Sequence, residues 1–100
     1  MFQKLKKLTG SYTNYHEKGK YHGKGPESRA KTSANEKAKK HSDPLLRTDW
    51  KSSNSDREAF KDESKRIESD KVGDTPGHKN PKNYNNIRSP GDTYRKKDKD

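Results

Sequence analysis

The scarcity of large apolar side chains constrains this chain more than any other feature. Leu, Ile, Val and Phe together account for nine of its 100 residues, whereas 40% of the residues are charged. Chains of this composition are often disordered, because they cannot bury enough apolar surface to offset the entropy of folding. A folded domain of this length would have a thin core and marginal stability. No large apolar pocket is expected.

Two further properties narrow the possible functions. The sequence has no run of about 20 apolar residues, so we expect no transmembrane helix and no membrane partner. It has no cysteine, which excludes a disulfide framework, an iron–sulfur centre and a thiol nucleophile. The first residues are basic but lack the apolar stretch of a signal peptide. We interpret residues 1–9 as a linker or a short strand.

Positive charge is concentrated in the first part of the chain. Residues 1–41 carry 11 basic and 3 acidic residues, a net charge of +8, out of +10 for the whole sequence. Such a surface attracts polyanions: nucleic acid, an acidic membrane surface or an acidic protein. The basic side chains expected to contact nucleic acid are Lys18, Lys20, Lys24, Lys31, Lys37 and His41.

The first ordered element is expected to be a β-hairpin over residues 10–25. Tyr12 and Tyr21 lie in strand-forming segments that a polar connection containing Gly19 joins. A helix should follow over residues 28–41, because an alanine recurs there every four residues. This ridge of small side chains would let the helix pack close to a sheet.

The middle of the chain predicts one more strand and one more helix. Residues 45–50 are the most apolar run, and their length favours a third, buried strand. Residues 55–67 predict a helix, because Ser55 and Glu58 fit a capping box. Phe60 and Ile67, seven positions apart, should mark the buried face of that helix.

Glycine and proline interrupt the sequence from residue 69 onward, which predicts loops and then a flexible tail over residues 91–100. The order of elements therefore predicts an α+β fold. A small hairpin and a third strand would pack with two helices, followed by a loop-rich C-terminal third. We place a single domain at residues 10–90.

At these positions the sequence resembles the GIY-YIG endonuclease family. Tyr12 in the first strand, residues 21–24 in the second and Arg29 on the next helix are similar to the signature of that family, which also runs from hairpin to helix. The first triplet reads Gly-Ser-Tyr where the family has Gly-Ile-Tyr. His22 replaces an aliphatic residue in the second triplet. The likeness covers roughly residues 10–87.

Two downstream segments extend the resemblance. Residues 58–67 are similar to the Glu-Ala-x-x-x-Glu-x-x-x-Ile segment of the excision-repair incision subunit, in which the second Glu holds the metal ion. That position is Glu63 here. Residues 81–85 resemble the family's Pro-x-Tyr-Asn, whose Asn, Asn85 here, lies at the active site. Residues 71–79 would be an insertion between them.

The resemblance implies a metal-dependent nuclease, most simply one acting on DNA. Glu63 would hold Mg²⁺ or Mn²⁺, since Mg²⁺ needs few protein ligands. The guanidinium of Arg29 would bind phosphate oxygens. Tyr12 would accept a proton from water, with Lys24 favouring its phenolate. Tyr21 would orient water or phosphate, and Asn85 would complete the catalytic set.

Each of these residues also has a simpler interpretation. Tyr12 and Tyr21 are aromatics of a type common in strands, and Arg29 and Glu63 are charged residues on exposed helices. Asn85 is a common turn former. Other residues have equally simple roles. His41 would stabilise a helix C-terminus, Trp50 would belong to the core, and the pair His16 and His22 is a weak zinc signal.

Several segments are also similar to C-terminal toxin domains of Rhs-type polymorphic secreted proteins. That likeness implies a monomeric antibacterial effector, delivered into the cytoplasm of a target cell and neutralised by an acidic immunity protein. Alternatives remain open. The chain could cleave tRNA or another RNA, could bind nucleic acid without cutting it, or could be a disordered polycation that folds on an acidic partner.

Overall fold

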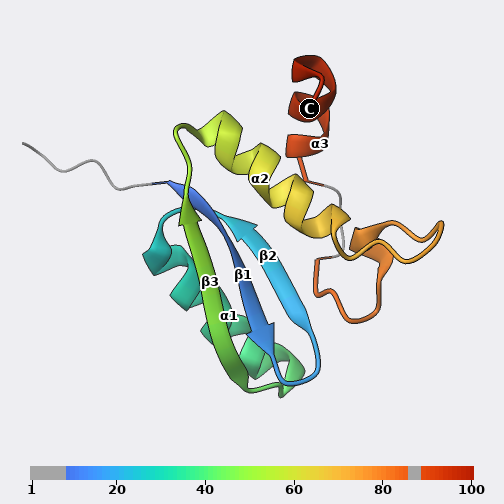
Figure 1. The fold of residues 1–100 in the computed structure, drawn as a ribbon. Coiled ribbons are helices and arrows are strands. Elements are labelled where there is room, and N and C mark those ends of the chain that lie inside the picture. The colour runs from blue at the N-terminus through green and yellow to red at the C-terminus, as the bar shows by residue number, and fades with distance from the viewer. Residues whose placement is uncertain (1–8, 86–88) are drawn as a thin grey trace, which may run out of the picture.

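A computed structural model describes residues 9–85 and 89–100 (Figure 1). The linker or short strand expected at the N-terminus lies, apart from Thr9, outside the described residues. The fold is α+β, as predicted from the sequence. Its elements are β1 (Gly10–His16), β2 (Lys20–Lys24), α1 (Glu27–His41), β3 (Leu45–Ser52), α2 (Asp56–Glu68), the 3₁₀ helix η1 (Gly77–Lys79) and α3 (Gly91–Asp98).

The three strands form an antiparallel sheet in the order β2-β1-β3. Tyr12 lies opposite Gly23, and Asn14 lies opposite Tyr21. Directly opposed residues share one face of a sheet, so both tyrosines are on the same face. This face is the one that α1 covers, because the Asn14 side-chain amide donates to the Ala30 carbonyl at 3.0 Å. The helix α2 packs across the other face and along β2 (Figure 1).

The core is built from small and polar side chains, as the composition requires. Ala30 and Ala34 of α1 and Ala59 of α2 are at most 1% exposed, so both helices approach the sheet closely. The buried hydrophobic set in the described residues also includes Tyr12 and Ile67. The alanine ridge was predicted, but much of the buried volume belongs to hydrogen-bonded polar residues.

A buried hydrogen-bond chain on the α2 face replaces apolar packing. The Arg66 guanidinium donates to the Thr13 hydroxyl at 2.8 Å, and that hydroxyl is bonded to Nδ1 of His22 at 2.8 Å. Nε2 of His22 contacts Asp70 at 2.7 Å, and Lys20 forms an ion pair with the same carboxylate. Burial lowers the pKa of His22, although Asp70 opposes that shift. His22 is therefore a neutral core residue here, fully engaged with protein partners.

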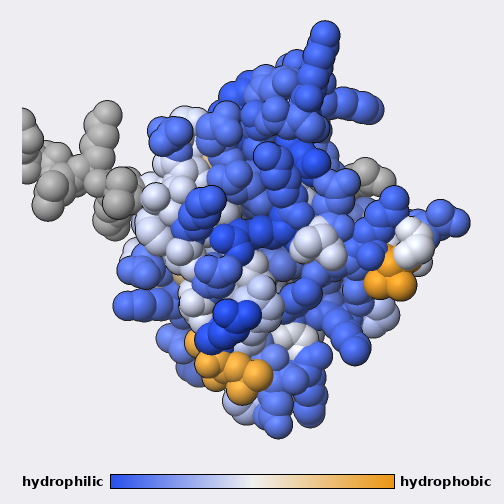
Figure 2. Space-filling view, in the orientation of Figure 1, coloured by the Kyte–Doolittle hydropathy of each residue, from blue (hydrophilic) through white to orange (hydrophobic). Residues whose placement is uncertain are grey.

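The third strand differs from its expected burial. Residues 45–52 do form β3, but the strand is at an edge of the sheet and most of its residues are exposed. Leu45 is 40% and Leu46 66% exposed, and Val72 is 64% exposed. Figure 2 shows two small orange patches on a mostly hydrophilic face. The central position belongs to the polar strand β1, whose side chains find hydrogen-bond partners on both faces.

The second helix begins where the sequence predicts. The Ser55 hydroxyl accepts a hydrogen bond from the backbone N–H of Glu58 at 3.1 Å, which is one half of a capping box. Ile67 is 6% exposed and Phe60 is half-buried. The predicted buried face is therefore confirmed at Ile67 and only in part at Phe60; Ala59 and Ser64 are also buried on this helix.

The expected flexible tail at residues 91–100 is instead the helix α3, which packs against α2. Lys61 of α2, whose side chain is 6% exposed, forms ion pairs with Asp98 at 3.0 Å and with Asp100. Arg57 adds two hydrogen bonds to Asp98. A Cβ at Gly91 would lie 1.8 Å from the Phe60 carbonyl oxygen, so glycine allows the two helices to meet. Ion pairs therefore hold α3 against α2. A search for periodic apolar residues does not detect such pairs.

We expect Lys61→Met to release α3 from α2 while the sheet stays folded, because the substitution removes the buried cation that both aspartates contact. Hydrogen exchange should show faster exchange of the α3 amides and unchanged protection in β1. Lys65→Met, at an exposed position of the same helix, is the matched control. Unchanged exchange of α3 in Lys61→Met would contradict this account of its docking.

Candidate functional site

The ring of Tyr12 extends from the central strand across the edge strand β2. A Cβ at position 23 would lie 2.2 Å from the ring Cζ and hydroxyl oxygen, so Gly23 leaves the space that the ring occupies. Tyr12 is 2% exposed, and its ring centroid lies 6.4 Å from that of Tyr21. The two phenols therefore form one cluster at the β2 side of the sheet.

One stripe of α1 faces this cluster. Its residues are spaced i, i+4, i+7 and i+8, the spacing of a single helical face: Arg29, Ser33, Glu36 and Lys37. The Ser33 side chain is hydrogen-bonded to the Tyr12 hydroxyl. The Lys37 amine lies 4.5 Å from the centre of the Tyr21 ring. The charge of Arg29 acts on both phenols.

Gly25 provides the turn that brings Arg29 to this position. It has a φ of +140°, and a Cβ there would lie 2.6 Å from the Arg29 Cδ atom. A side chain at Gly25 would therefore be both strained and in collision with the guanidinium arm. The hairpin thus contributes glycines at two points where the site needs space.

Glu63 reaches the cluster from α2. Its Oε1 accepts a hydrogen bond from the Ser89 hydroxyl at 2.6 Å. Burial raises the pKa of the Glu63 carboxyl, while Ser89, Lys24 and Arg29 act in the opposite direction. The charge of Glu63 in turn raises the pKa of both Tyr12 and Tyr21. The charge of this carboxylate therefore acts on both phenols, although Glu63 belongs to a different element and its hydrogen-bond partner is Ser89.

Burial is the main cause of a raised pKa at both tyrosines. For Tyr12, Ser33 and Arg29 partly offset this effect, and the carboxylates of Glu63 and Glu36 add to it. Both phenols are consequently protonated at neutral pH in the protein alone. Phenols and a carboxyl with raised pKa values in one place form a site that a cation would stabilise.

Lys24 does not have the neighbour that the sequence suggested. It pairs with Ser11 in the sheet and so lies on the α2 face, opposite Tyr12. Its amine is 3.0 Å from Asp56 and 4.6 Å from the centre of the Phe60 ring. Lys24 lowers the pKa of the Glu63 carboxyl. The sequence led us to expect that Lys24 would lower the pKa of Tyr12, but that pKa is raised.

Asn85 is committed to the backbone of β2. Its Oδ1 accepts from the His22 N–H at 2.7 Å, and its Nδ2 donates to the His22 carbonyl at 2.8 Å. The residue is 8% exposed. Asn85 therefore fastens the segment after η1 to the edge strand, and its amide is occupied by protein partners.

The predicted basic contacts are divided between free surface and internal pairs. Lys18 and Lys31 are exposed. The remaining members already contact protein groups: Lys20 pairs with Asp70, Lys24 with Asp56, Lys37 lies on Tyr21, and His41 stacks on Tyr84. Lys37 and His41 are nevertheless on the helix that bears Arg29 and Ser33.

Sequence reasoning missed three residues of the cluster. Ser33 and Glu36 lie four and seven positions after Arg29, so helical periodicity alone could have placed them on its face. Ser89 is 26 residues beyond Glu63 and follows a loop-rich segment. No sequence pattern marks it.

The chemistry of the cluster suits one kind of cation. Among the described residues, no group of three or more His, Cys, Asp or Glu side chains could hold a metal ion. A single carboxylate beside hydroxyl groups matches Mg²⁺, which keeps several of its waters, and does not match structural zinc. Glu63 is the residue that would hold such an ion.

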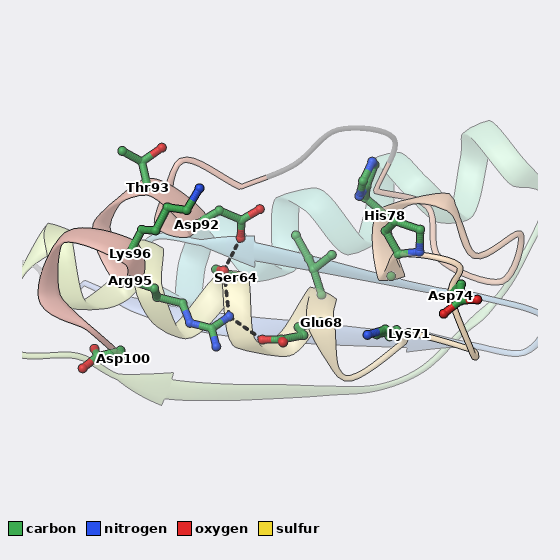
Figure 3. A pocket seen from close by; sticks show the side chains of 13 residues that line it. Ser64, Glu68, Lys71, Asp74, His78, Asp92, Thr93, Arg95, Lys96 and Asp100 are labelled. Carbon is green, nitrogen blue, oxygen red and sulfur yellow. Dashed lines mark hydrogen bonds and ion pairs between the residues drawn. The ribbon is translucent and has the colours of Figure 1, made fainter.

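A pocket of about 620 Å³ lies elsewhere, between α2, α3 and the loop before η1 (Figure 3). None of the predicted site residues lines it. Arg95 bonds Glu68 at 2.5 Å and Ser64 at 3.2 Å, and Ser64 is bonded to Asp92. Part of the polar lining is thus paired internally, while the buried Nε of Arg95 has no hydrogen-bond partner among the described residues.

Comparison of the chain with protein-family models, with curated proteins and with solved structures gave no match. Within the part of the chain that the structure describes, no helix is long and apolar enough to cross a membrane.

Replacing Glu63 by Gln should lower the phenol pKa of Tyr12 and of Tyr21, because it removes a negative charge that opposes phenolate formation. NMR titration of tyrosines labelled with ¹³C at Cζ would measure each phenol separately. Tyr84 is an internal control: Asp43 raises its pKa to about 12, and that value should stay the same. Unchanged values at Tyr12 and Tyr21 would place Glu63 away from the rings.

Proposed function

We propose that this chain is a metal-dependent nuclease of the GIY-YIG type, which hydrolyses phosphodiester bonds, with DNA as the principal candidate substrate. The observation that supports the proposal is electrostatic coupling between groups from three elements. Tyr12 and Tyr21 from the hairpin, Arg29 from α1 and Glu63 from α2 all act electrostatically on one another. These are the residues that the family resemblance selects.

Binding of the substrate would rest on the α1 side of the site. Arg29 offers a planar, permanently charged fork that matches two phosphate oxygens. Lys37, further along the same face of α1, would meet a neighbouring phosphate. The excess of positive charge in residues 1–41 would add the sequence-independent attraction typical of nucleic-acid binding.

Glu63 would hold Mg²⁺ or Mn²⁺, with the Ser89 hydroxyl fixing the orientation of the carboxylate. Such an ion supplies neutralisation of charge on the phosphoryl group and on the leaving oxygen. The carboxyl must be ionised to bind a cation. Since burial raises its pKa, activity should be lost at a higher pH than for an exposed glutamate.

Tyr12 would exchange a proton with the attacking water. In this mechanism the phenol first loses its proton to solvent. A proton of the attacking water then passes to the phenolate oxygen as the water oxygen bonds to phosphorus. The bond from phosphorus to the leaving oxygen breaks, and that oxygen takes a proton from solvent. Ser33 fixes the hydroxyl by its hydrogen bond. Tyr21, beside it, would orient the water or the phosphate.

The biological role we propose is that of an antibacterial toxin domain of the Rhs type, acting in the cytoplasm of a target cell. An acidic immunity protein would cover the basic front of the molecule, since complementary charge speeds association and selects partners. A toxin of this fold that cuts tRNA or another RNA is the closest alternative substrate assignment.

A non-catalytic nucleic-acid-binding module is the second candidate. It is favoured by the aromatic and cationic side chains that accompany each other on α1, where Lys37 lies on Tyr21 and His41 on Tyr84. The two candidates differ in what Glu63 does. A binding module would lose little when this residue becomes Gln.

The nuclease proposal predicts that the purified chain cuts plasmid DNA or total tRNA with Mg²⁺ and not with a chelator. Glu63→Gln and Arg29→Ala should each slow cutting by about a hundredfold or more, because each removes a charge that the transition state needs. Glu68→Gln is the matched control on the same helix, since Glu68 faces Arg95. Intact DNA and RNA in every lane would end the enzyme proposal.

The rate of cleavage should depend on pH in the same way as the ionised fraction of the Tyr12 phenol. Because the resting Tyr12 is protonated, its phenolate fraction, and so the rate, should rise about tenfold per unit from about pH 7 to pH 9. Tyr12→Phe should cut slowly with no such rise. Tyr15→Phe, on the opposite face of the same strand, should keep it. Initial rates at constant ionic strength measure this, and a rise retained in Tyr12→Phe would assign the proton to another group.

A further inference from the structure

The end of α1 carries an aromatic stack that the proposed reaction does not use. The rings of His41 and Tyr84 lie parallel, with centroids 3.7 Å apart and an angle of 4° between their planes. His41 is the last residue of α1. Tyr84 follows η1 and is joined to β2, where its N–H donates to the Lys20 carbonyl at 2.7 Å.

Contacts with Asp43 and with the hairpin turn hold Tyr84 in place. Its hydroxyl donates to Asp43 at 2.6 Å, and Asp43 is 1% exposed. The same carboxylate accepts the backbone N–H groups of Lys18 and Gly19 in the hairpin turn. A Cβ at Gly19 would lie 2.7 Å from the Tyr84 ring, so the turn packs directly against it. The Tyr84 ring is therefore fixed in place, and the His41 ring stacks on it.

The stack lines an open, basic pocket. His41 and Tyr84 form part of a cavity of about 480 Å³, together with residues 78–81 and Asn83. His78 and Lys79 contribute positive or protonatable groups to its wall. Burial and the charges of Lys40 and Lys37 lower the pKa of His41, which favours a neutral ring, and the Asp43 carboxylate opposes this shift. An aromatic side chain beside cationic groups can bind a nucleotide, because the base stacks on the ring and the phosphate is attracted to the cations.

The pocket and the proposed reaction centre lie along the same face of α1. Ser33, which bonds Tyr12, and then Lys37 and His41 follow one another at four-residue intervals on the same face of α1. Ser33 and His41 are separated by about 12 Å along the helix axis, at about 1.5 Å per residue. A few nucleotides of an extended strand span that distance, with Lys37 beside the intervening phosphates.

We propose that the His41–Tyr84 stack is a subsite for an unpaired nucleobase of the strand that is bound at the Tyr12–Glu63 site. The inference rests on the proposed function, because it takes nucleic acid as the ligand. A base inside a duplex has both faces covered by its neighbours, so only an unpaired base can lie on a protein ring. The preferred substrate is then a single strand or an unpaired loop, of RNA or of DNA.

The test uses the Glu63→Gln chain, which should bind without cutting, as the common background. Fluorescence anisotropy measures its affinity for labelled hexa-adenylate, hexa-deoxyadenylate and a short DNA duplex. Adding His41→Ala should weaken single-strand binding about fivefold to a hundredfold, the cost of losing one stacked base. Duplex binding should not change. The ribose and deoxyribose arms show which kind of strand the subsite prefers.

Two further substitutions separate stacking from charge. His41→Phe keeps a ring and should restore single-strand affinity, whereas His41→Lys adds charge without a ring and should not. Equal binding by the Phe and Lys variants would overturn the subsite, and this comparison does not depend on the fold of the Ala variant. If the chain with Glu63 intact cuts nothing while the ring dependence persists, the nuclease proposal fails and the subsite stands. If it cuts and binding shows no ring dependence, the subsite fails and the nuclease proposal stands.

Discussion

The passage of the Tyr12 ring across Gly23 is the contact on which the site depends. It fills the space where a side chain of β2 would stand, and it carries the hydroxyl from the central strand toward the β2 side. It also sets the distance to α1, whose Ser33 must reach that hydroxyl. A ring confined to the width of β1 would leave the phenol away from Glu63. The glycine is therefore a requirement of the packing of Tyr12, and through it of the proposed reaction centre.

A chain with so few apolar residues reaches a defined fold by satisfying buried polar groups. Thr13, His22 and Asp70 form a continuous hydrogen-bond chain that Arg66 of α2 completes. Burying any one of these polar groups without a hydrogen-bond partner would cost free energy, and the hydrogen bonds between them offset that cost. This polar core fixes the position of α2 against the sheet. Because Glu63 is on α2, the same core determines where its carboxylate lies relative to the hairpin.

Local chemistry predicted much of the fold and less of the site. The hairpin, the alanine ridge of α1 and the Ser55 cap depend on neighbouring residues, and they were predictable. The edge position of β3 depends on which strand lies at the centre of the sheet, and the docking of α3 depends on ion pairs between residues far apart in the chain. The spacing of apolar residues in the sequence encodes neither of these. Within the site, the charges of Arg29 and Glu63 both act on the Tyr12 phenol. Asn85 was placed by its motif, but its amide is consumed by the backbone of His22.

The C-terminal helix links the stability of the fold to the orientation of Glu63. Ser89, which bonds the Glu63 carboxylate, also bonds the Phe60 carbonyl and accepts the Gly91 N–H at the start of α3. That helix is held chiefly by ion pairs of Arg57 and Lys61 with its C-terminal end. Phe60 and Tyr94 add one tilted ring contact. The orientation of the proposed metal ligand thus depends on charges some 35 residues further along the chain, which couples it to ionic strength more than a ligand fixed within an apolar core would be.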